Sequence, residues 1–347
     1  MSLVDPFVSV VVPVLNREET VRACLESLLN LNYLEYEVIV VDGGSTDKTR
    51  KIIAEYPIKL LIDPRKGAYA ARNTAVRTAQ GEMIFFTDSD CIADRNVLRN
   101  LVRNFIDESV AGVGGQIASH NPTTVIERFS DIAGIVKVNY PKGPLKWNKS
   151  TLLSGGIYTA NAMYSKRILE EIGGFDPEFV VGGDYEFAWR VQRAGYRLMF
   201  DPEAIVFHSH RNTLLELIKQ FFNYGKEQAV KLEKQPESFF YIDVKTYVLP
   251  AYSLRFKSPF RAWITIDFFN LSILFLLLAA ISPSLLYISF LFFLATILGA
   301  VREAWKVAEA SKELRWIILY PFLHIVRHIS WFAGKFLGTV KHRLLTF

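Results

Sequence analysis

The chain has 347 residues, of which 50% are hydrophobic and 22% charged, and its 40 lysines and arginines exceed its 35 acidic residues. A chain so rich in apolar residues is not disordered as a whole, and two cysteines exclude a disulfide scaffold and a cysteine-rich metal site. The net charge of +5 does not indicate nucleic acid as a partner and is compatible with an anionic membrane or a phosphorylated substrate.

The first 120 residues alternate between strand-like and helix-like segments. Residues 8–14 are continuously apolar and rich in valine, as in a buried parallel strand, and Pro13 argues against a signal peptide. Further strands are expected at 37–41, 59–62, 83–87 and 111–117. Helices are expected at 18–29, 68–79 and 95–106, and another helix follows the turn at Asp42 and runs through Ile53. This alternation predicts a mostly parallel α/β sheet that binds ligands at the carboxyl ends of its strands.

Acidic residues follow two of these strands. Asp42 ends the strand at 37–41, and the Gly-Gly-Ser-Thr after it opens a helix whose N-terminus can bind an anion, although an ordinary turn is the alternative. Asp88-Ser89-Asp90 follows the strand at 83–87. Two carboxylates at a strand end can share a divalent cation, Mg²⁺ or Mn²⁺, with a sugar nucleotide, but many turns also contain two acids.

Three further positions carry candidate chemistry. Arg72 lies on the helix at 68–79, where its guanidinium could hold phosphate or simply face solvent. Asp184 follows two glycines at a helix start and is either a capping residue or a general base. His208 and His210 end a strand and point the same way, which allows one of them to bind a metal or a diphosphate, or both to be structural.

The C-terminal third is strongly apolar. Between residues 264 and 301 Asp267 is the only charged residue, and Pro283 divides the stretch into two pieces, each about long enough to cross a hydrocarbon core of roughly 30 Å. Lysines and arginines flank both outer ends, so the positive-inside rule predicts a multi-pass membrane protein whose catalytic domain is cytoplasmic. The alternative is a pair of helices buried in a soluble core.

Residues 316–337 form a third apolar segment that carries two histidines, an arginine and a lysine. We expect an amphipathic helix in the cytoplasmic interface, with a third spanning helix as the alternative. The predicted domains are therefore a catalytic domain at 1–235, a juxtamembrane linker at 236–262, two transmembrane helices at 263–302 and an interfacial region at 303–347.

The order of these motifs resembles that of the family 2 glycosyltransferases, which have the nucleotide-diphospho-sugar transferase (GT-A) fold. The resemblance covers about residues 7–230 and rests on Asp-Ser-Asp at 88–90, Gly-Gly-Phe-Asp at 173–176 and Asp-Tyr-Glu-Phe-Ala-Trp-Arg at 184–190. It implies a nucleotide-sugar site formed by Pro13, Leu15, Asp42, Arg72 and Asp88. It further implies a divalent cation on Asp90 and His208, and Asp184 as the base.

Two residues depart from the family pattern. Gly43 stands where many members have a second acid that reads the base, which puts a uridine preference in doubt, and Gly183 stands where members often have glutamate. The Gln-x-x-Arg-Trp motif of processive polymer synthases is not evident. The resemblance therefore does not extend to a polymer exporter.

The expected function is that of a membrane-anchored inverting glycosyltransferase acting on the hydroxyl of a lipid-linked glycan or glycolipid. A polyprenyl-phosphate acceptor is the alternative, and its charge would then be held by Lys142, Lys146 or Arg211. A nucleotidyltransferase or a non-catalytic membrane scaffold are rivals of other classes. The intact acids argue against a scaffold, and residues 16–19 lack the glycine of a phosphate-cradling loop.

Overall fold

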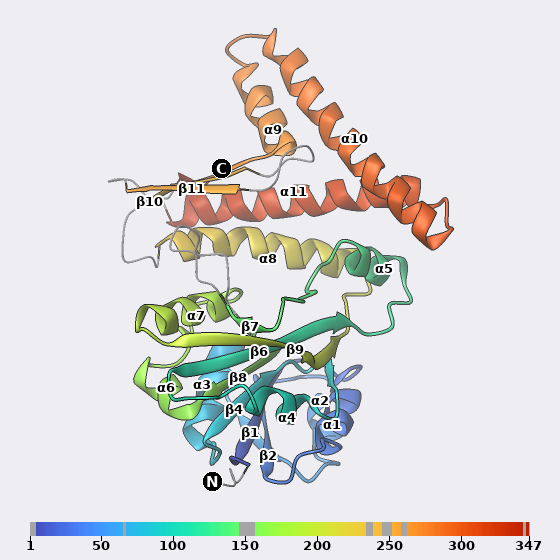
Figure 1. Cartoon of the computed structure of the whole chain (residues 1–347). Coiled ribbons are helices and arrows are strands. Elements are labelled where there is room, and N and C mark those ends of the chain that lie inside the picture. Colours follow the sequence, from blue (N-terminus) through green and yellow to red (C-terminus); the bar gives the residue numbers. More distant parts are fainter. Residues whose placement is uncertain are drawn as a thin grey trace. The chain divides into compact units, whose positions relative to one another are not determined.

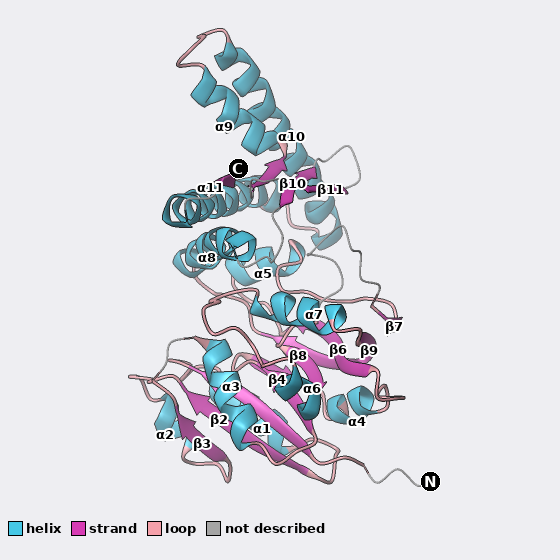
Figure 2. Cartoon of the chain, turned by 90° about the vertical axis from the view of Figure 1, so that its left-hand side faces the viewer, coloured by secondary structure: helices cyan, strands magenta, loops and turns pink. Residues whose placement is uncertain are grey.

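The computed structural model describes residues 5–64, 67–145, 157–233, 239–244, 252–257, 262–342 and 345–346. It divides into two compact units, Met1–His210 and Arg211–Phe347, each described by itself below. Strands gather in the first unit, and the long helices belong to the second (Figure 2).

A nine-stranded sheet with helices on both faces forms the first unit (Figure 1). Its strands are β1 Val8–Val14, β2 Tyr36–Asp42, β3 Lys59–Ile62, β4 Met83–Thr87, β5 Cys91–Ala93, β6 Val110–Ser119, β7 Gly143–Pro144, β8 Asn161–Ser165 and β9 Arg197–His208. Its helices are α1 Val21–Leu29, α2 Thr49–Ile53, α3 Ala68–Thr78, α4 Val97–Val102, α5 Val125–Ile132, α6 Lys166–Glu171 and α7 Gly183–Arg193.

The strand order is β3-β2-β1-β4-β8-β6-β9-β5, with β7 paired to β9. The first four strands in this order are parallel, whereas β8 runs antiparallel to both its neighbours. The predicted α/β fold is therefore confirmed, with a sheet that is more mixed than expected. Because the connections reverse direction at β1, the carboxyl ends of β1 and β4 flank a switch point, where such sheets bind ligands.

Both faces of this sheet are buried, which explains the continuous apolar strands. Every residue of β1 is buried, and alternate valines pack with α1 and α4 residues such as Leu25 and Leu98. On the opposite face, Phe86 of β4 contacts Phe175 at 5.2 Å between ring centroids, and Tyr164 contacts Phe187 at 5.1 Å. Burial of these side chains supplies most of the stabilisation of the unit.

The central strand β6 contains glycines because its neighbours leave no room for side chains. A Cβ on Gly112 would lie 2.6 Å from the Tyr164 ring, and one on Gly114 would lie 2.4 Å from Ile157. Strand β8, which supplies Tyr164, was not predicted, and β9, which ends at His208, is 12 residues long.

The second unit contains helices α8 Leu214–Glu233, α9 Phe268–Leu278, α10 Leu285–Ser311 and α11 Trp316–His342. It also has a four-stranded sheet of β10 Phe239–Val244, β11 Tyr252–Lys257, β12 Ala262–Ile266 and β13 Leu345–Thr346, in the order β11-β10-β12-β13. Strands thus occupy much of the segment predicted to be a linker. Helix α8, expected at the end of the catalytic domain, falls in the second unit.

Helices α8 and α11 touch through their backbones. A Cβ on Gly225 of α8 would lie 2.0 Å from the carbonyl oxygen of Trp331, and one on Gly334 of α11 would lie 1.9 Å from that of Phe222. At the end of the pair, His342 Nδ1 lies 2.5 Å from Glu233 Oε2. The two glycines therefore fix the register of these helices.

One helix in the described part of the chain, α10, is long and apolar enough to cross a membrane. Helix α9 has 11 residues and a length of about 16 Å, which is shorter than a hydrocarbon core of roughly 30 Å. The predicted pair of complete spanning helices is thus not established and stays a prediction.

Candidate active site

Three strand ends form one edge of the sheet in the first unit. Asp42 at the end of β2 is fully buried, and its carboxylate accepts hydrogen bonds from the backbone N–H groups of Gly44 (3.1 Å) and Ser45 (3.0 Å). The Asp42 side chain therefore stabilises its own turn. Pro13 is buried within β1 opposite Val41, and Leu15 beyond it is 51% exposed.

A buried ion pair joins α3 to the end of β4. Arg72 is 3% exposed, and its Nη2 lies 2.5 Å from Asp88 Oδ1. Its Nε is buried and has no hydrogen-bond partner among the described residues. A buried guanidinium with an unused donor next to a partly exposed carboxylate is suited to phosphate oxygens.

Asp90 and His208 come together because β5, directly after Asp90, pairs antiparallel with β9. Cys91 of β5 lies opposite His208 in this pairing, and His208 Nε2 is 3.5 Å from Asp90 Oδ1. Both side chains are largely buried. Arg17, beyond the end of β1, places its Nε 3.8 Å from Asp90 Oδ2. Nothing in the sequence predicts this contact beyond the position of Arg17 after a strand.

The side chains around Asp90 fit a divalent cation. His208 Nδ1 is buried with no hydrogen-bond partner in the described part of the chain. Candidate ligand atoms of Asp90, Cys91 and His208 lie within 4.8 Å of one another. Burial raises the pKa of the Cys91 thiol well above its usual value, and hard cations prefer oxygen, so the carboxylate and the imidazole are the better ligands.

Asp184 lies in the first turn of α7 but does not cap the helix. The N-cap is Gly182 in the left-handed region, with φ of 77°, and it has no side chain to form a cap. Asp184 is 8% exposed, and its Oδ1 accepts a hydrogen bond from the Tyr185 N–H at 2.9 Å. Asp184 is therefore not the N-cap residue, but its carboxylate accepts one N–H of the first turn, and the positive end of the helix favours its ionised form.

Helix α3 holds the segment that leads to Asp184. Asn73 exchanges two hydrogen bonds with the backbone of Phe175, at 2.7 and 2.9 Å. The hydroxyl of Tyr69 accepts a hydrogen bond from the Asp184 N–H at 3.3 Å. A Cβ on Gly183 would lie 2.9 Å from the Tyr69 ring, so the ring occupies the space that a side chain at 183 would need. Tyr69 was missed, although it lies three residues before Arg72 on the same helix face.

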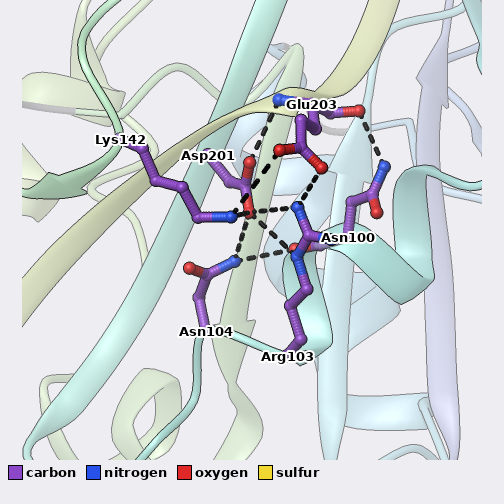
Figure 3. A network of polar contacts seen from close by, with 6 residues as sticks. All are labelled: Asn100, Arg103, Asn104, Lys142, Asp201 and Glu203. Carbon is purple, nitrogen blue, oxygen red and sulfur yellow. Dashed lines mark hydrogen bonds and ion pairs between the residues drawn. The ribbon is translucent and has the colours of Figure 1, made fainter.

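Of the basic residues considered for an acceptor phosphate, Lys142 is the one that lies in the described part of the first unit. Lys142 Nζ lies 3.0 Å from Asp201, which is fully buried and also receives Arg103 at 2.9 Å and Asn104 at 2.7 Å (Figure 3). Lys146 lies outside the described residues, and Arg211 begins the second unit. Lys142 thus belongs to a network that anchors β9.

We expect Lys142→Ala to leave the transfer rate unchanged and to lower the free energy of unfolding by about 1 kcal/mol or less, because the lysine is half exposed and Asp201 keeps its other partners. Asp201→Ala is the matched variant and should cost about 1–3 kcal/mol. Thermal melting and a transfer assay measure both effects. A slower Lys142→Ala enzyme with unchanged melting would instead place this lysine at the acceptor.

Comparison with known proteins identifies relatives of this chain. Residues 9–173 match the family model "Glycosyl transferase family 2". The chain is 29% identical to the glycosyltransferase AglE of Haloferax volcanii over 273 residues, covering 76% of this chain and 81% of the relative. It is 26% identical to a Methanococcus voltae enzyme over 354 residues, covering 96% and 98%. That enzyme is named dolichyl N-acetyl-alpha-D-glucosaminyl phosphate 3-beta-D-2,3-diacetamido-2,3-dideoxy-beta-D-glucuronosyltransferase.

A solved structure shares the fold over nearly the whole chain. It is the mannosyltransferase PcManGT of Pyrobaculum calidifontis, in complex with GDP-Man and Mn²⁺. The TM-score is 0.54 at 20% identity, with 98% of this chain and 88% of that one covered. At this identity the similarity concerns the fold alone.

Proposed function

The chain is a glycosyltransferase with a family 2 domain, and we propose that it transfers a sugar with inversion from a nucleotide-diphospho-sugar to the hydroxyl of a lipid-linked glycan or glycolipid. The observation that carries the proposal is the meeting of Asp90 with His208, and of Arg72 with Asp88, at the strand end that precedes β5. One edge of the sheet thereby holds both a site for a divalent metal ion, at Asp90 and His208, and the buried guanidinium of Arg72, which can bind a diphosphate.

Each residue at this edge has a defined part in donor binding. Asp90 and His208 would hold a divalent cation, which would compensate the charge of the diphosphate. Arg72 offers its free Nε to a diphosphate oxygen, and its pair with Asp88 keeps the guanidinium in place. Pro13, the exposed Leu15 and the turn built by Asp42 border the nucleoside, as the resemblance implies.

Asp184 is the single carboxylate assigned to the acceptor. Its carboxylate takes the proton of the acceptor hydroxyl as the acceptor oxygen forms a bond to the anomeric carbon. The bond from that carbon to the diphosphate breaks in the same displacement, so the configuration inverts. No second carboxylate is required as a nucleophile.

The acceptor is inferred from a relative that matches over 98% of its length. The name of the Methanococcus voltae enzyme describes transfer to a sugar that is already linked to dolichyl phosphate. This favours a glycan hydroxyl over a bare polyprenyl phosphate, as does the engagement of Lys142 by Asp201. The glycosyltransferase family match argues against the nucleotidyltransferase and scaffold alternatives.

A lipid-product assay tests this function. The full-length enzyme is incubated with native lipid extract, Mn²⁺ and a panel of nucleotide sugars, and the lipids are compared by mass spectrometry. We expect one sugar to be added to lipids that already carry sugar. A product consisting of a polyprenyl phosphate with a single sugar would identify the alternative acceptor, and donor hydrolysis without any lipid product would contradict both.

We further propose that the second unit attaches the enzyme to the membrane. Helices α8 and α11 are in contact. With both helices in the plane of the membrane on one side, the chain between them crosses the membrane an even number of times or not at all. Because α9 is short, we propose that α9 and α10 enter the membrane as a hairpin and return to the same side. Lys306, Lys312 and Arg315 near its end favour the cytoplasmic side.

The surface of α11 supports an orientation in the plane of the membrane. Between residues 318 and 340 every exposed residue of this helix is apolar, namely Ile318, Phe322, Ile329, Ala333, Phe336, Leu337 and Val340. The polar residues His324 and Lys335 are buried instead. Beyond its first turn, α8 exposes polar residues such as Lys219 and Asn223. This polarity fits lipid on the outer side of α11 and water beyond α8.

Depth measurements should distinguish an in-plane helix from a spanning one. Single cysteines replacing Ile318, Ile329 or Val340 are labelled with a fluorophore in vesicles that contain lipid quenchers at known depths; the native cysteines are buried. We expect one common depth near the headgroups for all three sites and no quenching for the control Lys219→Cys. A gradient of depth along α11 would indicate a spanning helix, and exposure of all sites to water would contradict membrane contact.

A further inference from the structure

Tyr69 lies between the donor-binding pair and the proposed base without belonging to either. Its side chain is buried, and its hydroxyl accepts the N–H of Asp184 at 3.3 Å. The guanidinium carbon of Arg72 lies 5.2 Å from the centroid of its ring. One side chain thus contacts both the start of α7 and the arginine that binds Asp88.

The contact with α7 is specific because the ring fills the space beside Gly183. A Cβ at this position would meet three ring atoms at 2.9–3.0 Å. Since Gly182 provides a left-handed turn and Gly183 has no side chain, the backbone of α7 approaches the ring closely. The start of the helix, and with it Asp184, is held against α3.

The same face of α3 fixes the segment that precedes α7. Tyr69, Arg72 and Asn73 are spaced as neighbours on one side of a helix. Asn73 binds the backbone of Phe175, whose ring lies 5.6 Å from that of Tyr69. Both ends of the segment from 174 to 184 therefore rest on one helix face. Burial raises the pKa of Tyr69 well above its usual value, so the hydroxyl keeps its proton.

We infer that Tyr69 is a positioning residue that sets Asp184 relative to the Arg72–Asp88 pair, and thereby aligns the acceptor with the bound donor. The inference rests on the proposed role of Asp184 as base. Displacing a base by a fraction of an ångström lowers turnover. Donor binding should not weaken, because the buried Tyr69 side chain is not among the residues assigned to the donor.

A double-mutant cycle tests this role. Tyr69→Phe keeps the ring and removes the hydroxyl, and we expect single-turnover transfer at saturating donor to fall about fivefold, as for the loss of one hydrogen bond. In the Asp184→Asn background the same change should have almost no further effect, because no base remains to be positioned. Donor affinity should stay within about twofold throughout, which a disturbed Arg72 would not allow.

Tyr33→Phe is the matched control. Tyr33 is equally buried, and its hydroxyl donates one hydrogen bond, at 2.7 Å to the Pro6 carbonyl, on the opposite edge of the sheet. This variant should lower stability to a similar extent without a change in transfer rate. Gly183→Ala, which pushes on the ring, should reproduce the pattern of Tyr69→Phe.

Different results of these experiments would overturn the positioning role of Tyr69 and the proposed role of Asp184 as base. Equal losses for Tyr69→Phe in both backgrounds, or a loss also in Tyr33→Phe, would overturn the positioning role and leave Asp184 as the base. A wild-type rate for Asp184→Asn alone would overturn the proposed base, and the positioning role with it.

Discussion

Replacing Asp184 by asparagine is expected to lower single-turnover transfer to a hydroxyl acceptor by about 10²–10⁴-fold. Asparagine preserves the size of the side chain and can still accept the Tyr185 N–H, but it cannot take a proton at neutral pH. Donor affinity should hardly change, because Asp184 acts on the acceptor. Quenched-flow transfer into membrane lipid at saturating donor measures the rate.

The nearest acids provide matched controls for this variant. Glu186 forms an ion pair with Arg190 at 2.6 Å, and Asp176 accepts the Glu178 N–H at 3.0 Å. Glu186→Gln and Asp176→Asn should therefore keep the rate within a few-fold. A near wild-type rate for Asp184→Asn, with a large loss in one of the controls, would move the base to that residue. A small loss with a lipid-phosphate acceptor is expected, since no proton need be removed.

Asp90→Ala should abolish cation-dependent donor binding. Loss of outer-shell partners alone typically costs about 10–100-fold in metal affinity, so the loss of a ligand should cost at least as much. The substitution would also leave the negative charge of the donor diphosphate less compensated, and His208 would lose its carboxylate neighbour. Calorimetric titration of nucleotide sugar in the presence of Mn²⁺ measures the change.

Cys91→Ala is the control for the cation site. Cys91 is adjacent to Asp90, and its sulfur lies within 4.8 Å of the candidate ligand atoms of Asp90 and His208. Its buried thiol should not ionise, so binding should remain unchanged. Weaker binding in Cys91→Ala would make the thiol a ligand. Unchanged donor affinity in Asp90→Ala would remove Asp90 from the cation site.

The sequence predicts the parallel half of the sheet well because each strand is buried on both faces. The strands at 8–14, 59–62 and 83–87 were expected with the bounds that the structure has. Strand β8 was missed because Asn161 and Ser165 at its ends carry no strand signal, and its place depends on the glycines of β6. Such complementarity is a tertiary property, which no local pattern encodes.

The site was predictable only in part, for a similar reason. Residues at strand ends, such as Asp88 and Asp90, are marked by the pattern itself. The proximity of His208 to Asp90 depends on the pairing of β5 with β9, and only the resemblance to a family suggested it. The contacts of Tyr69 and Arg17 depend on how helix ends and loops meet, so neither residue was selected from the sequence.

The exposed side of α11 also depends on tertiary contacts that the local sequence pattern does not predict. Its histidines, arginine and lysine led to the prediction of an amphipathic helix in the cytoplasmic interface. The structure buries His324 and Lys335 and exposes the apolar side chains, because α11 packs along α8. Which side of a helix faces outward is decided by its partner, and that partner lies far away in the sequence.

The pairing of α8 with α11 also sets the order in which parts of the protein can fold during translation. Glu233 and His342, which meet at the end of the pair, are 109 residues apart. At ribosomal rates of about 5–20 residues per second, α8 leaves the ribosome roughly 5–20 seconds before its partner is complete. During that interval the catalytic unit, whose last residue is His210, can already fold. A nascent chain is thus able to carry a finished catalytic unit while α8 still awaits the last helix to be synthesised.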